Sequence, residues 1–570
     1  RLIAGGGVHR AAAIDCGFSR SRPEKLTLPN FRYFRRILRD SAAFPRIFWR
    51  YGACSTARSH SGPDSRVLHD NVAGRAALRG LPSMKNASFV PALACATTLL
   101  TAAPALAAGP APTFNKDIAP ILNSKCVTCH RTGEIAPMSL TSYKEVRPWV
   151  RSIKQKVSSK EMPPWFADAK HSLPIDRDSS LTPEQINTIV AWVDAGAPQG
   201  TGEAPAGPKF VNGWHWDREP DAIVEMPMEW SVPGEGEIPN FTIWAPNPYK
   251  GRDTYLNAVE LRPTNLAVTH HIGLRAAPLP AGTTLGRGKT WKDGPVTDFV
   301  PVFPDGTSFN EISGGDINEV LEAGGADAEA IRKKRAEVQL EAFNGQSNGN
   351  LLLFYVPGGG FYNFPDGAVK VIHSNDYLAW GMHYTPTGKP EKDRTRFGMW
   401  FAKNQPKYEI MTSRIGQTHV VEGQEVESAS KIPNIPPFAD DWKITAITAF
   451  KDDITIYGMW PHMHLRGKDT TVIATYPDGR EQIILHTPKW DFNWQLQYQF
   501  KEPIHLPAGS TLKAVGHFDN TVSNKWNPAP DKPVYWSEQS WDEMFNTWME
   551  YSIDKDVIQP QKTTTQQQQH

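Results

Sequence analysis

The chain has 570 residues, which is too long for one hydrophobic core and predicts two to four domains. Its 61 Lys and Arg residues nearly balance its 60 Asp and Glu residues, but the charge is spread unevenly. Residues 1–83 carry a local charge of +10, and the chain without them and Lys85 carries about −10. A region this acidic is not expected to bind nucleic acid.

Residues 84–107 have the pattern of a secretory signal peptide. A short cationic segment follows Met84, an apolar run covers 89–106, and small residues at 105–107 form a cleavage site. Because a signal peptide begins its chain, we interpret residues 1–83 as an upstream extension foreign to the mature protein. Export predicts a periplasmic or secreted protein, and no later run is long enough to span a membrane.

Two cysteines, Cys126 and Cys129, follow this predicted cleavage site. The other three precede it: Cys16, Cys54 and Cys95. We therefore expect a mature protein without disulfides. With His130 the two cysteines form a C-x-x-C-H motif, which is typical of covalent haem c attachment by two thioethers, with the histidine binding iron. A thioredoxin-like redox pair is the alternative, but it lacks the adjoining histidine and the preceding strand.

Residues 109–198 around this motif are predicted to form a small helical cytochrome c domain. Apolar residues recur at helical spacing in three segments, 114–122, 146–157 and 186–193. The stretch that begins Met162-Pro163 resembles the distal-methionine loop of class I cytochromes c, which implies that Met162 is the sixth haem ligand. Met138 is the rival, with core packing as its structural role. His/Met ligation suits electron transfer.

The composition changes after this domain. Residues 199–213 are rich in Gly and Pro and are predicted to be a semi-flexible linker. Short β-prone runs alternating with turn residues then predict two antiparallel, jelly-roll-like sandwiches at 214–403 and 404–556. A polar, Ala-rich stretch near 316–345 is expected to be a solvated helical insertion. Residues 557–570 are predicted to be a disordered tail.

His462 and His464 lie between two β-prone runs of the second sandwich. Residues two apart on a strand project from the same face, so both imidazoles should point toward one place. Met544, near the end of the chain, adds a thioether that is a copper ligand or a core residue. Two imidazoles make half of a metal site, although hydrogen-bonded surface histidines would have the same pattern.

Adjacent histidines, His270 and His271, lie in the first sandwich. On a regular strand they would point to opposite faces, so a shared metal requires a bend or a strand end. His383 supplies a third imidazole in the same sandwich. The other histidines of the β region are assigned structural roles, the last being the nearest to the second site: His373, His419, His486, His505 and His517.

In chain order these motifs read His-His, His-Tyr, His-x-His-Leu and Asp-Glu-Met. This order resembles the copper type II, ascorbate-dependent monooxygenases, the family of the peptide-amidating hydroxylase and dopamine β-hydroxylase, over about residues 215–555. The resemblance implies two copper ions: an electron-storing site of His270, His271 and His383, and an oxygen-activating site of His462, His464 and Met544. Imidazole suits copper, and a thioether favours Cu(I).

The chain departs from this family where substrate binds. The peptide-amidating branch holds its substrate with an Arg two residues before His-x-His and a Tyr four after the Met, whereas this chain has Trp460 and Trp548. No carboxylate clamp is evident. Together with Trp541, these tryptophans indicate a small-molecule substrate of apolar or aromatic character.

The expected activity is hydroxylation of a substrate C–H bond with dioxygen. The resemblance implies ascorbate as the reductant, and the haem bound through Cys126 and Cys129 is expected to replace or relay it. The acidic charge favours a basic or neutral redox partner protein, such as another cytochrome. A non-catalytic haem c and copper protein for electron transfer or copper binding is the alternative.

Overall fold

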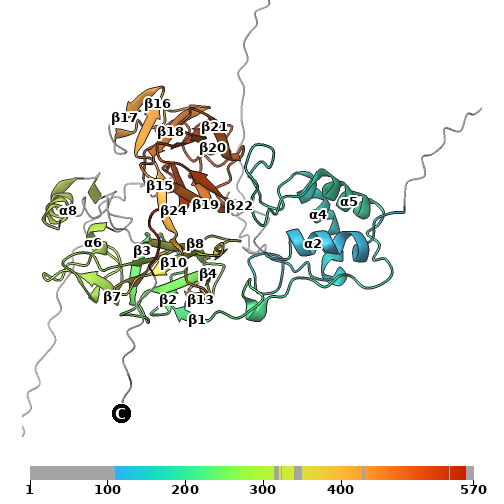
Figure 1. Cartoon of the computed structure of the whole chain (residues 1–570), viewed down its shortest axis with the longest axis horizontal. Coiled ribbons are helices and arrows are strands. Elements are labelled where there is room, and N and C mark those ends of the chain that lie inside the picture. The colour runs from blue at the N-terminus through green and yellow to red at the C-terminus, as the bar shows by residue number, and fades with distance from the viewer. Residues whose placement is uncertain are drawn as a thin grey trace, which may run out of the picture. The chain divides into compact units, whose positions relative to one another are not determined.

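Helices dominate the first part of the described chain and one later insertion, whereas strands make up most of the rest (Figure 1). The computed structural model describes residues 110–313, 320–321, 324–338, 350–426, 431–537 and 540–559. The predicted upstream extension, the signal peptide and their three cysteines lie outside the described residues, as does the tail from 560. No helix in the described part of the chain combines the length and apolarity that a membrane span needs.

The helical module follows the predicted pattern. Its elements are η1 (Phe114–Ile118), α2 (Ala119–Lys125), α3 (Tyr143–Val146), η2 (Arg147–Trp149), α4 (Val150–Ser158) and α5 (Pro183–Asp194). The Thr182 side chain caps α5 by accepting from the backbone N–H of Gln185, whose own side chain accepts from the Thr182 N–H. Ile153, Val157 and Ile189 are buried in one apolar core, so the predicted helical faces are confirmed.

The predicted linker is held against the helical module. The Asn115 side chain donates to the carbonyl of Gly202, and the Asn123 side chain donates to that of Pro205 at 3.2 Å. A short 3-10 turn, η3 (Val211–Gly213), ends the linker. Glycine and proline supply few side chains for packing, so these asparagine amides fix the path of the linker backbone.

The first β module has two main sheets. Their strands pair antiparallel, as predicted, except for one short parallel pair. Its strands are β1 (Ala222–Glu225), β2 (Trp230–Val232), β3 (Phe241–Pro246), β4 (Thr254–Arg262), β5 (Thr269–Ala277), β6 (Thr284–Lys289), β7 (Val296–Val302), β8 (Asn350–Tyr355), β9 (Phe361–Asn363), β10 (Ala368–Ile372), β11 (Tyr377–Tyr384), β12 (Glu391–Asp393), β13 (Arg396–Phe401) and β14 (Tyr408–Glu409). One sheet has the order β1-β13-β4-β10-β14, with β9 beside β4, and the other has the order β3-β11-β5-β8. Apolar residues of both sheets share one core, which is the packing of a sandwich.

The second β module also has two antiparallel sheets over one core. Its strands are β15 (Met411–Ile415), β16 (Thr418–Val421), β17 (Gln424–Val426), β18 (Trp442–Ala449), β19 (Ile454–His462), β20 (Gly467–Thr475), β21 (Glu481–Thr487), β22 (Tyr498–Leu506), β23 (Thr511–Phe518) and β24 (Asn546–Ile553). The sheet orders are β15-β24-β19-β22 and β17-β16-β18-β23-β20-β21. Burial alternates residue by residue along β18 and β23, as expected for strands with one face on the core.

The chain crosses from one β module to the next at Ile410, a little later than residue 404. β14 still pairs with β10 of the first module, whereas β15 pairs with β24 of the second. At the other end, Val557 bridges to Tyr408, so the paired chain continues past residue 556. Only Ile410 separates β14 from β15, so the composition of the sequence does not change at the boundary between the two modules.

A buried ion pair links the two β modules. Lys370 on β10 lies 3.4 Å from the carboxylate of Glu550 on β24, and both side chains are at most 1% exposed. The Lys370 ammonium also donates to the hydroxyl of Thr412 at 2.8 Å, and Gln497 donates to the second oxygen of Glu550 at 2.9 Å. Burial lowers the pKa of Lys370 and raises the pKa of Glu550. In both residues the charge of the partner shifts the pKa in the opposite direction, but by less.

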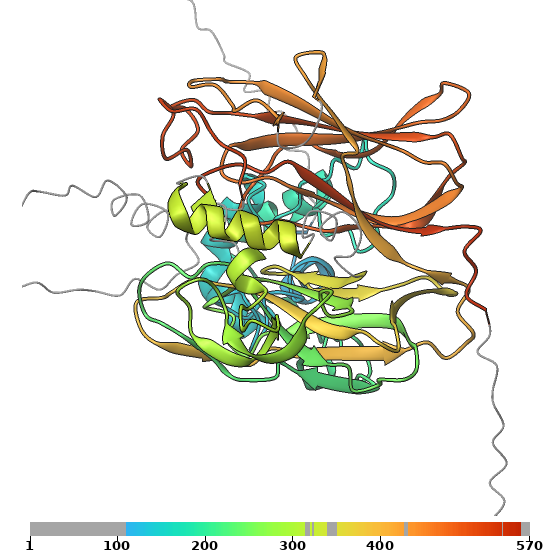
Figure 2. The same cartoon turned by 90° about the vertical axis from the view of Figure 1, so that its left-hand side faces the viewer.

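The insertion in the first module is helical, as predicted. It contains α6 (Asn310–Ser313) and α8 (Gly325–Glu337), and Figure 2 shows α8 beside the layered strands. The prediction that this insertion is solvated is only partly correct, because Ile331 packs with Phe303 and Ile312 in a small separate core. This apolar contact gives the polar helix one buried side.

A charged contact near this crossing predicts a pH dependence of stability. His373 lies 3.3 Å from the Glu409 carboxylate, with Asp253 and Asp376 nearby, and hydrogen bonding to Glu409 raises its pKa to about 9. A histidine pKa raised on folding stabilises the protein below pH 6.5, and this contribution is lost as the pH rises through about 9. We expect a loss below about 1 kcal/mol, because half of the side chain is exposed.

Denaturant unfolding at pH 6 and at pH 9.5 measures this loss. Glu409→Gln should reduce the difference between the two pH values, and Glu481→Gln, in an exposed lysine pair, should leave it unchanged. Equal pH dependence in all three proteins would contradict the assignment.

Candidate metal centres

A β-bulge brings the two adjacent histidines of the first module together. β11 pairs with β5 so that His383 faces His271 and Tyr384 faces Thr269, which leaves His270 as the extra residue on β5. An extra residue bends the strand and re-aims its side chain. The bend that a shared metal requires is therefore present at His270.

Three imidazole nitrogens converge at this bulge. Nδ1 of His383 lies 3.3 Å from Nδ1 of His270 and 2.9 Å from Nε2 of His271. Two nitrogens that bind one ion at about 2.0 Å lie roughly 2.8–3.5 Å apart for angles of 90–120°. Two of the three nitrogen pairs have this spacing, and all three ligand atoms lie within 4.8 Å of one another, so the cluster could hold a single metal ion.

The environment keeps these imidazoles neutral. Burial is the main cause that lowers the pKa of His270 to about 4 and that of His383 to about 3, and it also lowers the pKa of His271. Phe354 of β8 stacks on the His271 ring at 5.3 Å between centroids. Neutral imidazole is the form that binds metal, so these histidines are prepared as ligands.

The second pair of histidines lies at a strand end. β19 stops at His462, and His464 belongs to the loop before β20, so the expectation of a continuous strand through both residues is wrong. Their ring centroids are nevertheless 5.2 Å apart, at nearly right angles. The two imidazoles are therefore close, as predicted, but a strand end and a turn bring them together rather than one continuous strand.

Hydrogen bonds at Nδ1 orient both of these imidazole rings. Gln495 donates its amide N–H to the Phe492 carbonyl, so its oxygen accepts from Nδ1 of His462 at 2.7 Å. Nδ1 of His464 lies 3.3 Å from the carbonyl of Asp542 and can only donate to it. In both rings Nδ1 is therefore the donor, and Nε2 is the nitrogen that carries the lone pair.

Glu543 connects the His-x-His stretch to the Met544 segment. Its fully buried carboxylate accepts from the backbone N–H of His464 at 2.8 Å and from that of Arg466 at 2.6 Å. These bonds bring the neighbouring Met544 to the same part of the module, where it is half-buried. Burial raises the pKa of Glu543 to about 8, against the lowering effect of these backbone N–H groups. Sequence reasoning quoted Glu543 but gave it no role, since a buried acid cannot be recognised without its partners.

One aromatic ring touches both histidine groups. The centroid of Phe492 lies 5.8 Å from that of His270 and 5.9 Å from that of His464, so the two imidazoles are at most about 12 Å apart. A charge on His462 would also lower the pKa of His270 and of His271. Phe492 was missed in the sequence because nothing in its local pattern indicates a contact between modules.

The haem motif has the donor set that covalent haem requires. Cys126 and Cys129 are free thiols, and burial raises their pKa values to about 12 and about 11. Nδ1 of His130 lies 3.2 Å from the carbonyl of Met138, which leaves Nε2 free for iron.

The two methionines considered as haem ligands have different settings. The side chain of Met138 packs on the helical core, as its structural role required. Met162 is half-buried after α4, where its backbone N–H donates to the Lys156 carbonyl at 3.2 Å. Its role as the sixth ligand stays a prediction.

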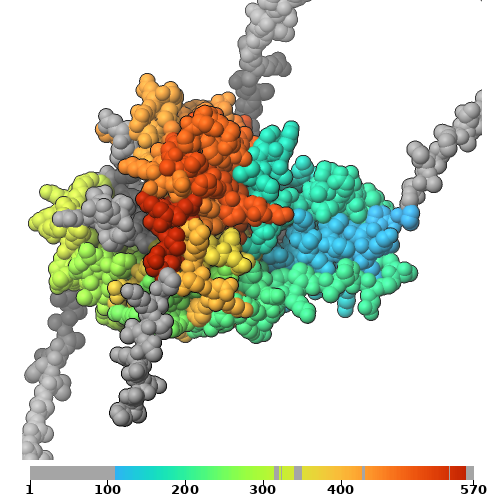
Figure 3. All heavy atoms as spheres, viewed as in Figure 1, coloured from blue at the N-terminus to red at the C-terminus, as the bar shows by residue number. Residues whose placement is uncertain are grey.

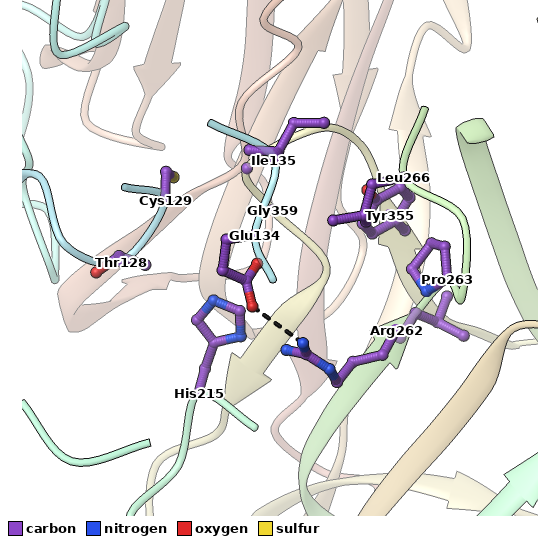
Figure 4. A pocket seen from close by; sticks show the side chains of 12 residues that line it. Thr128, Cys129, Glu134, Ile135, His215, Arg262, Pro263, Leu266, Tyr355 and Gly359 are labelled. Carbon is purple, nitrogen blue, oxygen red and sulfur yellow. Dashed lines mark ion pairs between the residues drawn. The ribbon is translucent and has the colours of Figure 1, made fainter. Parts of the chain in front are cut away.

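A hollow beside Cys129 lies between the haem motif and the first β module. Thr128, Glu134, His215, Arg262 and Tyr355 are among its lining residues, and Glu134 and Arg262 form an ion pair at 3.0 Å (Figure 4). A side chain at Gly358 would lie 3.6 Å from the Cys129 sulfur and 3.6 Å from Trp494. The loop that carries Gly358 therefore lies close to Cys129 of the C-x-x-C-H motif.

The tryptophans expected to line a substrate pocket are only partly brought together. Trp460 and Trp548 stack with centroids 6.0 Å apart, on the paired strands β19 and β24. Trp541 is 45% exposed, and its carbonyl accepts from Arg466 at 2.7 Å. His517 lies on β23, where it pairs with Asp469 at 2.7 Å, as expected for a structural histidine.

Comparisons with known proteins do not identify this chain. No family model matches it, and neither does any curated protein. Among solved structures, PNGF-II aligns with 58% of this chain at 10% identity and a TM-score of 0.21, and the chain spans just under two thirds, 65%, of PNGF-II. The infectious bursal disease virus Gx strain aligns over 59% of this chain and 73% of its own at 9% identity and a TM-score of 0.14. Protein lmo2446 from Listeria monocytogenes EGD-e aligns over 32% and 14% at 12% identity and a TM-score of 0.11, and scores this low carry no argument.

Proposed function

We propose that this protein is an exported copper-dependent monooxygenase that receives electrons through a covalently bound haem c. Supporting the proposal most directly, imidazoles of two groups on different β modules contact one phenylalanine, Phe492. In the net reaction one oxygen atom of O2 enters a substrate C–H bond and the other leaves as water, with two electrons and two protons consumed. The jelly-roll-like fold and the membership of the copper type II family belong to the same proposal.

The first site would hold copper with His270, His271 and His383. Three imidazoles without an anionic ligand accept both Cu(I) and Cu(II), which suits storage of one electron. The bulge at His270 and the Phe354 ring fix the ligand directions. This preorganisation lowers the structural change that accompanies electron transfer.

The second site would hold copper with His462, His464 and Met544. Copper in such a site supplies the one-electron chemistry that dioxygen activation requires, and the soft thioether favours Cu(I). Gln495 and the Asp542 carbonyl orient the imidazoles, and Glu543 fastens the methionine segment to the His464 backbone. In the same sheet the partly exposed Trp548 stacks on the buried Trp460, and its ring would contact an apolar or aromatic substrate.

The haem would be held by Cys126, Cys129 and His130, with Met162 as the second axial ligand. Gly358, beside the Cys129 sulfur, lies on the loop that follows β8, and the β8 residue Phe354 stacks on His271. This short path through one strand favours electron delivery from the haem to the first copper. Ascorbate or a redox protein would then serve as the external reductant.

Oxygen uptake by a variant at Met544 tests the proposal. Met544→Leu keeps the volume but removes the sulfur, and we expect ascorbate-driven O2 consumption of the copper-loaded protein to fall at least 10-fold. Met411→Leu, on β15 outside the proposed site, is the matched control and should keep the wild-type rate.

The haem spectrum separates the two candidate functions. Reduction of the haem by ascorbate should be the same in Met544→Leu as in the wild type. Unchanged oxygen uptake in Met544→Leu would contradict the assigned role of Met544 and would favour a haem and copper protein that only transfers electrons.

A further inference from the structure

A third group of potential metal ligands lies away from the proposed copper sites. Ligand atoms of Asp168, His171 and His486 all lie within 4.8 Å of one another. Asp168 and His171 belong to the segment between α4 and α5, and His486 is on β21 of the second module. Sequence reasoning gave His486 a structural role and did not consider the other two, because more than 300 positions separate them from it.

The segment that carries Asp168 and His171 closes the open edge of the second module. β21 and β22 are the edge strands of its two sheets. The backbone N–H of Asp168 donates to the His486 carbonyl at 2.8 Å, and that of Leu173 donates to the Ile484 carbonyl at 2.9 Å. Asp176 donates to the Gln499 carbonyl at 2.8 Å, so the segment then reaches β22. Figure 3 shows teal atoms of this part of the chain against orange atoms of the second module.

The three side chains are held in place by bonds that leave ligand atoms available. Nδ1 of His486 lies 2.9 Å from the Thr471 hydroxyl, so Nε2 is the nitrogen available to a ligand. The Asp168 carboxylate accepts from the backbone N–H of Lys170 at 3.0 Å and from Nδ1 of His171.

We propose that Asp168, His171 and His486 bind a Zn²⁺ ion that fastens this segment to the second β module. Two imidazoles and one carboxylate form a recurrent zinc ligand set, with water in the remaining position. The exposed Asp168–His171 pair alone would contribute little, since surface ion pairs are worth at most about 1 kcal/mol. An ion shared with His486 instead joins two distant parts of the chain, and this proposal does not depend on the copper sites.

Zinc binding by the haem-containing full chain tests the proposal. After metal removal, the protein is dialysed against buffered Zn²⁺ alone, and the bound zinc is measured by elemental analysis. The imidazoles of the first site also bind zinc, so the decisive quantity is the difference between variants. His171→Ala and His486→Ala should each bind one Zn²⁺ per chain fewer than the wild type.

His505→Ala is the matched control. His505 also forms a surface pair with a carboxylate, Asp554 at 3.0 Å, on the same module, but among the described residues it belongs to no group of three ligands. This variant should bind as much zinc as the wild type. Equal zinc content in all four proteins would overturn the proposal.

Hydrogen exchange gives a local readout that does not depend on stoichiometry. Zinc should slow exchange in peptides covering residues 165–177 of the wild type and of His505→Ala. In His171→Ala and His486→Ala the same peptides should exchange alike with and without zinc. Zinc-dependent protection of these peptides in His486→Ala would likewise overturn the site.

Discussion

Replacing His383 by alanine is expected to remove one of two copper ions from the protein. His383 is the imidazole whose Nδ1 lies within 3.3 Å of both other ligand atoms, so its loss leaves two nitrogens and an open position. Loss of an outer-shell partner already weakens metal binding 10–100-fold, and loss of a ligand should weaken it by more than 100-fold. Copper titration of the metal-free protein measures the change.

The companion variants make this result specific. His517→Ala removes a partly exposed histidine that pairs with Asp469, and it should keep both copper ions. The second site should keep its affinity in His383→Ala, because Phe492 rather than a shared ligand lies between the two groups. Loss of both ions together, or of neither, would contradict the assignment of two separate sites.

Glu550→Gln is expected to lower the free energy of unfolding by about 3–5 kcal/mol. The change leaves the buried Lys370 ammonium without its counter-charge between the two β modules. Lys370→Met should have an effect of similar size for the converse reason. Chemical denaturation followed by circular dichroism measures both.

A double variant and a surface pair serve as controls for this prediction. Lys370→Met combined with Glu550→Gln should recover much of the loss, because neither buried charge remains. Lys513→Met breaks an exposed pair with Glu481 and should change stability by at most about 1 kcal/mol. Additive losses in the double variant would show that the two charges are not coupled.

The β architecture was predictable because short β-prone runs are separated by turn residues along the sequence. The α5 cap at Thr182 was predictable because it is equally local. The crossing at Ile410 and the hydrogen-bonded linker were not predictable, since both depend on partners distant in the sequence.

The candidate ligands could be found from residue types, whereas their supporting groups could not. His270 and His271 were predicted to need a bend, and the bulge provides it. Glu543 and Phe492 are ordinary residues in sequence, and only their contacts with the histidine groups reveal a role. His464 lies beyond the end of β19. The predicted closeness of His462 and His464 is therefore right, although the predicted strand through both residues is wrong.

The copper and iron content of the purified protein distinguishes a copper monooxygenase with a haem from a cytochrome without copper. The chain from residue 84 onward would be produced in a host that attaches haem, loaded with copper, freed of excess metal and analysed for both elements. We expect two copper ions for each iron, with one copper lost in His383→Ala. Iron without tightly bound copper would contradict the proposed monooxygenase and leave a cytochrome joined to two β modules.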